Sequence, residues 1–151
     1  MADAAVGTAE AVLGDYVVEE QVGFLLRRAH QRHAALFQEG IAEAAELTPM
    51  QFTALIKTVE LGRVTQNHLG RLAAMDPATV QGVVRRLIAR GLVRRTPDPM
   101  DRRTAVLTAT EEGVALARRA VACARRITEA TLLPLDAEER QRLLALLRKL
   151  A

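Results

Sequence analysis

A short polar run in the middle of the chain carries side chains suited to hydrogen-bonding the edges of DNA bases. It begins at Pro77, and the small residues Ala78 and Gly82 lie beside Thr79 and Gln81. A glutamine amide can donate to and accept from an adenine at once, and a threonine can hydrogen-bond a base or cover a thymine methyl group. Small neighbours allow a helix to approach the bases closely. We therefore expect Thr79 and Gln81 to contact bases in a major groove.

Cationic and polar side chains around this run are suited to the phosphate backbone. Arg85 and Arg86 come one helical turn later and would neutralise phosphates. Thr65, Gln66 and Asn67 begin the preceding helix, where side chains and free N–H groups can hold a phosphate. The alternative for the two arginines is that they only solvate an exposed helix face.

A loop at residues 96–103 (TPDPMDRR) contains two prolines and two aspartates and ends in Arg102 and Arg103. Short strand-like runs flank it, so we expect a hairpin with a basic tip. An arginine is drawn into a narrow minor groove by its strong negative potential. Asp101 is placed to hold the Arg103 guanidinium through a paired hydrogen bond.

The first long helix carries a different group, in which arginine and histidine alternate with apolar residues. A buried ring beside arginine and histidine donors is suited to an aromatic carboxylate or its CoA thioester. The candidate ligand-binding residues are Phe24, Arg27, His30, His33 and Phe52. Alternatively, the histidines are interface residues and the arginines pair with nearby acids. A metal site is less favoured, because no other His or Cys lies near His30 and His33 in sequence.

The lone cysteine, Cys123, lies in the middle of a helix between alanines. A redox sensor needs a thiol with a lowered pKa and access to solvent. Arg125 and Arg126 follow it, and we expect them to lie on other faces of the helix. Cys123 is therefore interpreted as a small buried packing residue, with redox sensing as the less favoured alternative.

Composition and charge limit the possible classes of protein. The 151-residue chain has the size of one domain, and half of its residues are apolar. Residues 1–47 contain three Arg against eight Asp and Glu, whereas residues 71–103 contain eight Arg against three Asp. This segregation indicates that the middle of the chain faces a polyanion. A solvated basic surface is the alternative.

Several other classes are not favoured. No apolar stretch approaches the roughly 18–20 residues that span a bilayer, and the N-terminus lacks the pattern of a secretory signal. A single cysteine excludes an intramolecular disulfide. There is no nucleophile–base pair, glycine-rich phosphate loop or metal-ligand spacing, so an enzyme is not expected. We expect a cytoplasmic protein with no cofactor, no metal and no membrane association.

Hydrophobic periodicity and capping residues predict the elements that position these side chains. Helices are expected at about 15–45, 48–62, 65–74, 76–91, 111–133 and 136–151, with strands at 92–95 and 104–108. This order predicts a mainly α fold with a small β-hairpin wing, namely a winged helix-turn-helix with N- and C-terminal dimerisation helices. The expected divisions are a flexible arm at 1–14, a DNA-binding region at 47–110, and a dimerisation region at 15–46 and 111–151. The leucine stripe of the last helix should pack against another subunit or, alternatively, onto the chain's own core.

Three stretches resemble the MarR family of bacterial regulators: LTPMQFTALIKTVELGRVTQNHLG, MDPATVQGVVRRLIARGLV and RRTPDPMDRRTAVLTATEEG. The match runs from Leu47 to Gly113, and one small departure is Ala109, where the family usually carries leucine. The resemblance implies a homodimer on a pseudo-palindromic operator, usually a repressor released by a small ligand. It also implies that Thr79, Gln81 and Arg85 face the major groove and that Arg103 is the wing arginine.

The string GFLLRRAHQRH in the first helix is similar to MarR-type regulators of aromatic-acid catabolism. That similarity implies an effector of the benzoate, hydroxycinnamate or nicotinate type. It also implies a pocket between the first helix, the second helix and the dimerisation helices. Two other interpretations stay open: a regulator of this family that responds to an oxidant or a phenolic drug, and an architectural winged helix that binds DNA without sequence preference.

Overall fold

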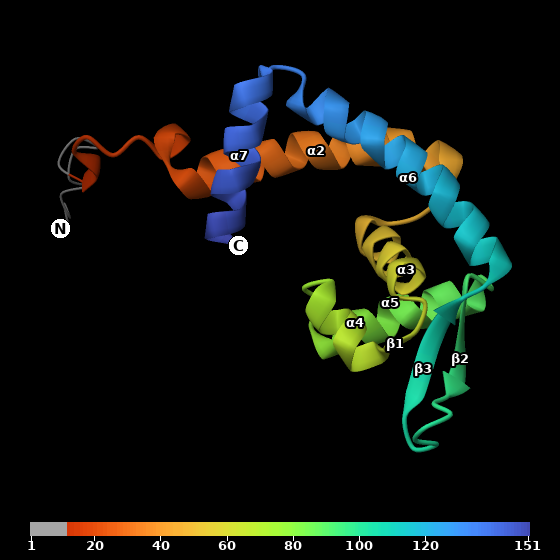
Figure 1. Cartoon of the computed structure of the whole chain (residues 1–151). Coiled ribbons are helices and arrows are strands. Elements are labelled where there is room, and N and C mark those ends of the chain that lie inside the picture. Colours follow the sequence, from red (N-terminus) through yellow and green to blue (C-terminus); the bar gives the residue numbers. More distant parts are fainter. Residues whose placement is uncertain (1–11) are drawn as a thin grey trace, which may run out of the picture.

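A bundle of long helices forms one part of the molecule, and three shorter helices with a small sheet form the other (Figure 1). The computed structural model describes residues 12–151, except the side chains of residues 42–44. We call α2 (Val22–Ala44), α6 (Glu111–Leu132) and α7 (Ala137–Leu150) the helical region. The rest, from α3 to β3, is called the head. The predicted mainly helical fold with a small β wing is confirmed, whereas most of the predicted arm at 1–14 lies outside the described residues.

The first long helix begins later than its periodicity predicts. α2 starts at Val22 rather than near Asp15, and a single 3-10 turn, η1 (Val18–Glu20), precedes it. Gln21 between them is extended, and its side-chain Nε2 donates to the Val17 carbonyl at 2.7 Å. The β-branched valines in this segment lose side-chain freedom in a helix, which favours the interruption.

Capping residues set where the helices of the head begin. The head contains α3 (Pro49–Leu61), α4 (Gln66–Leu72) and α5 (Pro77–Ala89). Thr48, Thr65 and Asp76 each accept a hydrogen bond from the backbone N–H three residues on. Proline stands at the first helical position of α3 and α5, where no N–H partner is needed. These local signals place the start of each helix.

The wing is a three-stranded sheet rather than a two-stranded hairpin. Strands β2 (Val93–Pro97) and β3 (Ala105–Ala109) pair antiparallel, and a two-residue strand, β1 (Val64–Thr65), pairs with the other edge of β3. Val64 lies opposite Leu107 in this register. A two-residue strand shows no alternation, so β1 could not be predicted. It ties the wing to the start of α4.

The core of the head continues into the helical region where α6 begins. Leu55, Leu69 and Leu87 are almost fully buried within the head, and Ile41 carries the core into α2. A Cβ atom added to Gly113, in the first turn of α6, would lie 2.0 Å from the Leu92 carbonyl oxygen. Only glycine allows α6 to approach the backbone of the head this closely.

Arg90, at the C-terminal end of α5, joins the two parts of the molecule through hydrogen bonds. Its guanidinium donates to the carbonyls of Glu46 and Ala45 at 2.9 and 3.1 Å. Both carbonyls lie just past the end of α2, where Glu46 adopts a positive φ of 49°. The end of the expected base-reading helix is thereby connected to the end of the longest helix of the helical region.

The last helix, α7, presents apolar side chains that the chain itself does not cover. Leu146 is 48% exposed and Leu150 is 70% exposed, and the turn before the helix exposes Leu133. The alternative in which this stripe packs onto the chain's own core is wrong for these residues. Among the described residues, no helix is long and apolar enough to span a membrane.

Candidate nucleic-acid interface and ligand cavity

The first turn of α5 is held by its N-cap residue. The Asp76 carboxylate accepts from the Thr79 backbone N–H at 2.9 Å and from the Thr79 hydroxyl. The side-chain hydrogen bond from Thr79, together with the backbone one, holds the pKa of Asp76 below its ordinary value. Because the Thr79 hydroxyl donates to Asp76, only its methyl group and its oxygen lone pairs remain available to an outside partner.

The two faces of α5 differ as a groove-reading helix requires. Its apolar face is buried in the head. Gln81, Arg85 and Arg86 are exposed, and the two arginines make no ion pair with any carboxylate of residues 12–151 whose side chain is described. A Cβ atom on Gly82 would meet nothing within 4 Å. This face therefore carries hydrogen-bonding and cationic groups with room for a close approach.

At the wing tip, Asp101 does not hold the Arg103 guanidinium, so the predicted paired hydrogen bond is wrong. The Asp101 carboxylate accepts from the Arg103 backbone N–H at 3.0 Å and from the Thr104 hydroxyl at 2.9 Å. Two residues of separation suit this local side-chain-to-backbone turn better than a side-chain pair. Asp101 shapes the turn, and the Arg102 and Arg103 side chains are both exposed.

Two residues at the start of α4 make side-chain hydrogen bonds with other residues of the chain. The Thr65 hydroxyl caps α4 by accepting from the His68 N–H at 3.3 Å, and the Gln66 side chain accepts from the Arg95 guanidinium of the wing. Asn67 is exposed, as expected of a phosphate-contacting residue. The role of Arg95 was missed because a strand arginine gives no sequence signal of its distant partner.

A second link holds the wing against the head. Arg63 pairs with Asp98 at 3.4 Å, and Asp98 also accepts from the Met100 N–H at 2.9 Å. The Arg95–Gln66 contact and this ion pair join the wing to the loop before α4 and to α4 itself. These two contacts therefore hold the wing against the start of α4.

The helical region contains a cavity of about 760 Å³, bordered by the N-terminal half of α2, the C-terminal end of α6 and α7. His30 and His33 both line it, as expected of ligand-binding residues. Its lining is mostly apolar: Val22, Leu25, Leu26, Ala29, Leu132, Leu143, Leu144 and Leu147, with Glu20, Thr128 and Thr131 as the other polar residues.

The other three predicted ligand residues lie elsewhere. Arg27 stacks over the Phe24 ring at 5.3 Å, and neither residue borders the cavity. Phe52 packs edge-on against Phe37 at a ring-centroid distance of 5.7 Å. Helical geometry explains the division, because positions 26, 30 and 33 share one face of α2 whereas 24 and 27 lie on other faces. The lining residues of α6 and α7 were missed, since the sequence does not show which distant helices meet.

His33 makes a specific contact across the wall of this cavity. Its Nδ1 lies 2.9 Å from the Thr131 hydroxyl oxygen, and that hydroxyl donates to the Ile127 carbonyl at 2.8 Å. One turn along α2, the ring of Phe37 stands 6.5 Å from the His33 ring. His33 is therefore half-buried and oriented by its neighbours.

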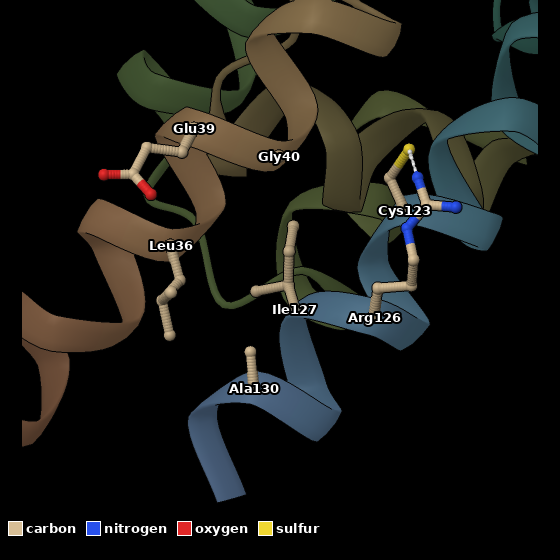
Figure 2. Close-up of a pocket in the computed structure, with 7 residues that line it drawn as sticks. All are labelled: Leu36, Glu39, Gly40, Cys123, Arg126, Ile127 and Ala130. Carbon is tan, nitrogen blue, oxygen red and sulfur yellow. Dashed lines mark hydrogen bonds between the residues drawn. The ribbon is translucent and has the colours of Figure 1, made fainter. Parts of the chain in front are cut away.

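Cys123 is buried, in agreement with its interpretation as a packing residue, and lines a separate cavity of about 270 Å³ (Figure 2). The prediction that Arg126 lies on another face is wrong, because its guanidinium donates to Cys123 Sγ at 3.2 Å. Residues three apart on a helix are neighbours. Opposite them, Gly40 lets α2 approach α6, since a Cβ atom there would lie 3.0 Å from Ile127.

Among residues 12–151, apart from the side chain of Glu43, no group of three or more His, Cys, Asp or Glu could hold a metal ion.

The exposed face of α5, the cationic wing and the long helices that precede and follow the head define the class of protein. It is a winged-helix DNA-binding regulator. The chain belongs to the MarR family, whose profile matches residues 45–104. It is a transcriptional regulator and not an enzyme.

Three similar proteins extend this assignment over most of the chain. The HTH-type transcriptional repressor NicR of Pseudomonas putida is 45% identical over 135 residues, which are 89% of this chain and 85% of NicR. BpsR of Bordetella bronchiseptica, whose DNA binding is regulated by 6-hydroxynicotinic acid, is 42% identical with a TM-score of 0.86, covering 91% of this chain and 97% of BpsR. PcaV of Streptomyces coelicolor, solved with its natural ligand, is 30% identical with a TM-score of 0.80, covering 89% and 94%.

Proposed function

We propose that the protein is a homodimeric cytoplasmic repressor that binds a pseudo-palindromic operator and is released by a small aromatic acid. The observation that carries this proposal is the 760 Å³ cavity, whose apolar walls hold two histidines. Residues 47–110 would bind DNA, and residues 15–46 with 111–151 would form the dimer and the sensor. NicR is a repressor and the DNA binding of BpsR is regulated by 6-hydroxynicotinic acid, which supports a repressor with an aromatic-acid effector here.

The chemistry of the cavity favours an aromatic acid of modest size. Its volume lies within the roughly 300–1,000 Å³ of ordinary ligand sites. The leucines of α2 and α7 can enclose a ring, and the polar side chains gather on α2 and α6. The ionisable residues that border the described cavity are Glu20, His30 and His33, and the His30 imidazole would supply the donor for a carboxylate. We favour the free acid, and the CoA thioester is the second form to test.

The apolar surface around the cavity supports a dimer. Leu146 and Leu150 on α7, and Tyr16 and Val17 before α2, are exposed. Apolar groups that lie together on a surface mark a site of association. A second copy packed on α7 would lie beside the helix that supplies Leu143 and Leu147 to the cavity, so that effector binding could change how the two heads are spaced.

On the DNA side, Thr79 and Gln81 would read bases, with Pro77 and Ala78 allowing the first turn of α5 to enter the groove. Arg85, Arg86 and Asn67 would contact phosphates, as would the backbone N–H groups at the start of α4. Arg102 and Arg103 would enter the minor groove. All of these side chains except the half-buried Thr79 are exposed, which supports this assignment.

Thermal unfolding with a panel of aromatic acids and CoA thioesters tests the sensor. An effector at a hundred times its dissociation constant should add about 2.7 kcal/mol to the free energy of unfolding. His33→Ala should lose this response, whereas His68→Ala, which removes a histidine from α4 outside the cavity, should keep it. If no compound changes the melting temperature, the proposed sensor is wrong.

Competition in gel-shift assays tests the DNA-binding part. Duplexes from upstream of the protein's own gene should outcompete random duplexes at fixed salt. An architectural protein that reads no sequence would bind both equally, with the same dependence on salt concentration.

A further inference from the structure

One hydrogen bond within α6 and one between α6 and α2 determine which nitrogen of His33 carries a proton. The Ile127 carbonyl oxygen lies 2.8 Å from the Thr131 hydroxyl oxygen. A carbonyl can only accept, so the hydroxyl proton must lie between these two oxygens. The hydroxyl then has only lone pairs left for His33 Nδ1 at 2.9 Å. In the neutral ring the proton is therefore on Nδ1, and Nε2 is an acceptor.

This arrangement has a consequence for the ligand that enters the cavity. His33 and Thr131 both border it, and Nδ1 is already occupied by Thr131. We propose that Thr131 is a positioning residue that fixes the His33 tautomer, so that the site selects aromatic acids carrying a ring donor for Nε2. A ring hydroxyl or the ring N–H of a hydroxypyridine provides such a donor. This inference rests on the proposed effector site.

An aromatic neighbour and a second hydrogen bond between α2 and α6 lie beside the His33–Thr131 pair. The Phe37 ring lies 6.5 Å away on the same helix, and Arg32 donates to the Ala130 carbonyl at 3.3 Å, next to Thr131. The Arg32 hydrogen bond joins the same stretches of α2 and α6 as the His33–Thr131 hydrogen bond, which orients the ring. A donor-bearing ligand therefore meets an acceptor that is already oriented, whereas an unsubstituted ring leaves that acceptor without a partner.

Two pairs of acids, measured by titration calorimetry, test the selectivity. The pairs are 6-hydroxynicotinic with nicotinic acid and 4-hydroxybenzoic with benzoic acid. The parent protein should bind the hydroxylated member of at least one pair about tenfold more tightly. Thr131→Ser keeps the hydroxyl and should keep this preference. Thr131→Val has nearly the same shape but no hydroxyl, and its preference should fall below about threefold.

Nitrogen-15 NMR of the His33 ring shows which ring nitrogen carries the proton. It therefore separates control of the tautomer by Thr131 from a purely structural role of that residue. The parent and Thr131→Ser should show the Nδ1–H form, and Thr131→Val should show a mixture or the Nε2–H form. Thermal melts of all three proteins control for folding. An Nε2–H ring in the parent, or an unchanged ligand preference in a folded Thr131→Val variant, overturns this inference alone. If none of the four acids binds the parent protein, the proposed effector site fails with it.

Discussion

The head and the helical region position their functional side chains in different ways. In the head, each helix begins at a capping residue a few positions from the groups that would meet DNA, as Asp76 does for Thr79. In the helical region, the cavity is assembled from α2, α6 and α7, which come from opposite parts of the chain. A DNA-reading surface can therefore be built from local structure, whereas the sensor requires tertiary packing.

The two regions also differ in what their surfaces present. Both regions expose arginines, but the helical region also exposes leucines and valines that line its cavity, among them Val22, Leu25 and Leu144. Arg90 and Gly113 lie where the two regions meet: one joins α5 to the end of α2, and the other lets α6 approach Leu92. A movement of α2 or α6 would act on α5 and β2 through these contacts.

The junction should be the most sensitive part of the molecule. Gly113→Ala places a methyl group against the Leu92 carbonyl, which cannot move without disturbing strand β2. We expect a loss of about 3 kcal/mol in the free energy of unfolding, measured by urea denaturation. Unchanged stability would show that the two regions do not pack as closely as the structure indicates.

Removal of the wing arginine should separate the two regions functionally. Arg103→Ala should weaken operator binding by about 1–3 kcal/mol while thermal stability and effector binding stay unchanged. Arg142→Ala removes an exposed arginine from α7 and serves as the control. Fluorescence anisotropy with a labelled operator measures both. Equal affinities for the two variants would remove the wing from the DNA-binding mechanism.

Gly82 should show opposite effects on stability and on DNA binding. Gly82→Ala meets no neighbour within 4 Å and replaces a glycine inside a helix, so it should stabilise the protein by about 0.5–1 kcal/mol. If α5 enters the groove closely at this position, the added methyl group should weaken operator binding. A variant that gains stability and binds the operator as tightly as the parent would show that Gly82 faces away from the DNA.

The N-cap of α5 should produce a small dependence of stability on pH. The pKa of Asp76 is lowered in the folded state, so its contribution is complete above its unfolded value of about 3.9 and is lost as the pH falls through the lower folded value. Asp76→Asn keeps a capping oxygen but cannot titrate. The stability difference between parent and variant should shrink below about pH 4 in urea titrations. A constant difference across this range would contradict the role of the charge.

The sequence predicted the head well because its signals are local. Thr48, Asp76 and their following prolines indicated the helix starts, and the prolines and arginines of 96–103 indicated the wing. Asp101 was assigned the wrong partner, since the backbone N–H of Arg103 is closer than its guanidinium. In the helical region the sequence identified His30 and His33 as cavity residues. It did not identify Thr131, because only the packing of α6 against α2 brings that residue to His33.

Operator affinity measured with and without 6-hydroxynicotinic acid, in the parent protein and in His33→Ala, tests the proposed sensor directly. We expect the acid to weaken operator binding by the parent at least about tenfold, which corresponds to about 1.4 kcal/mol. We expect His33→Ala to bind the operator as tightly as the parent and not to respond to the acid. An acid that releases both proteins equally would place the sensor outside the α2–α6–α7 cavity.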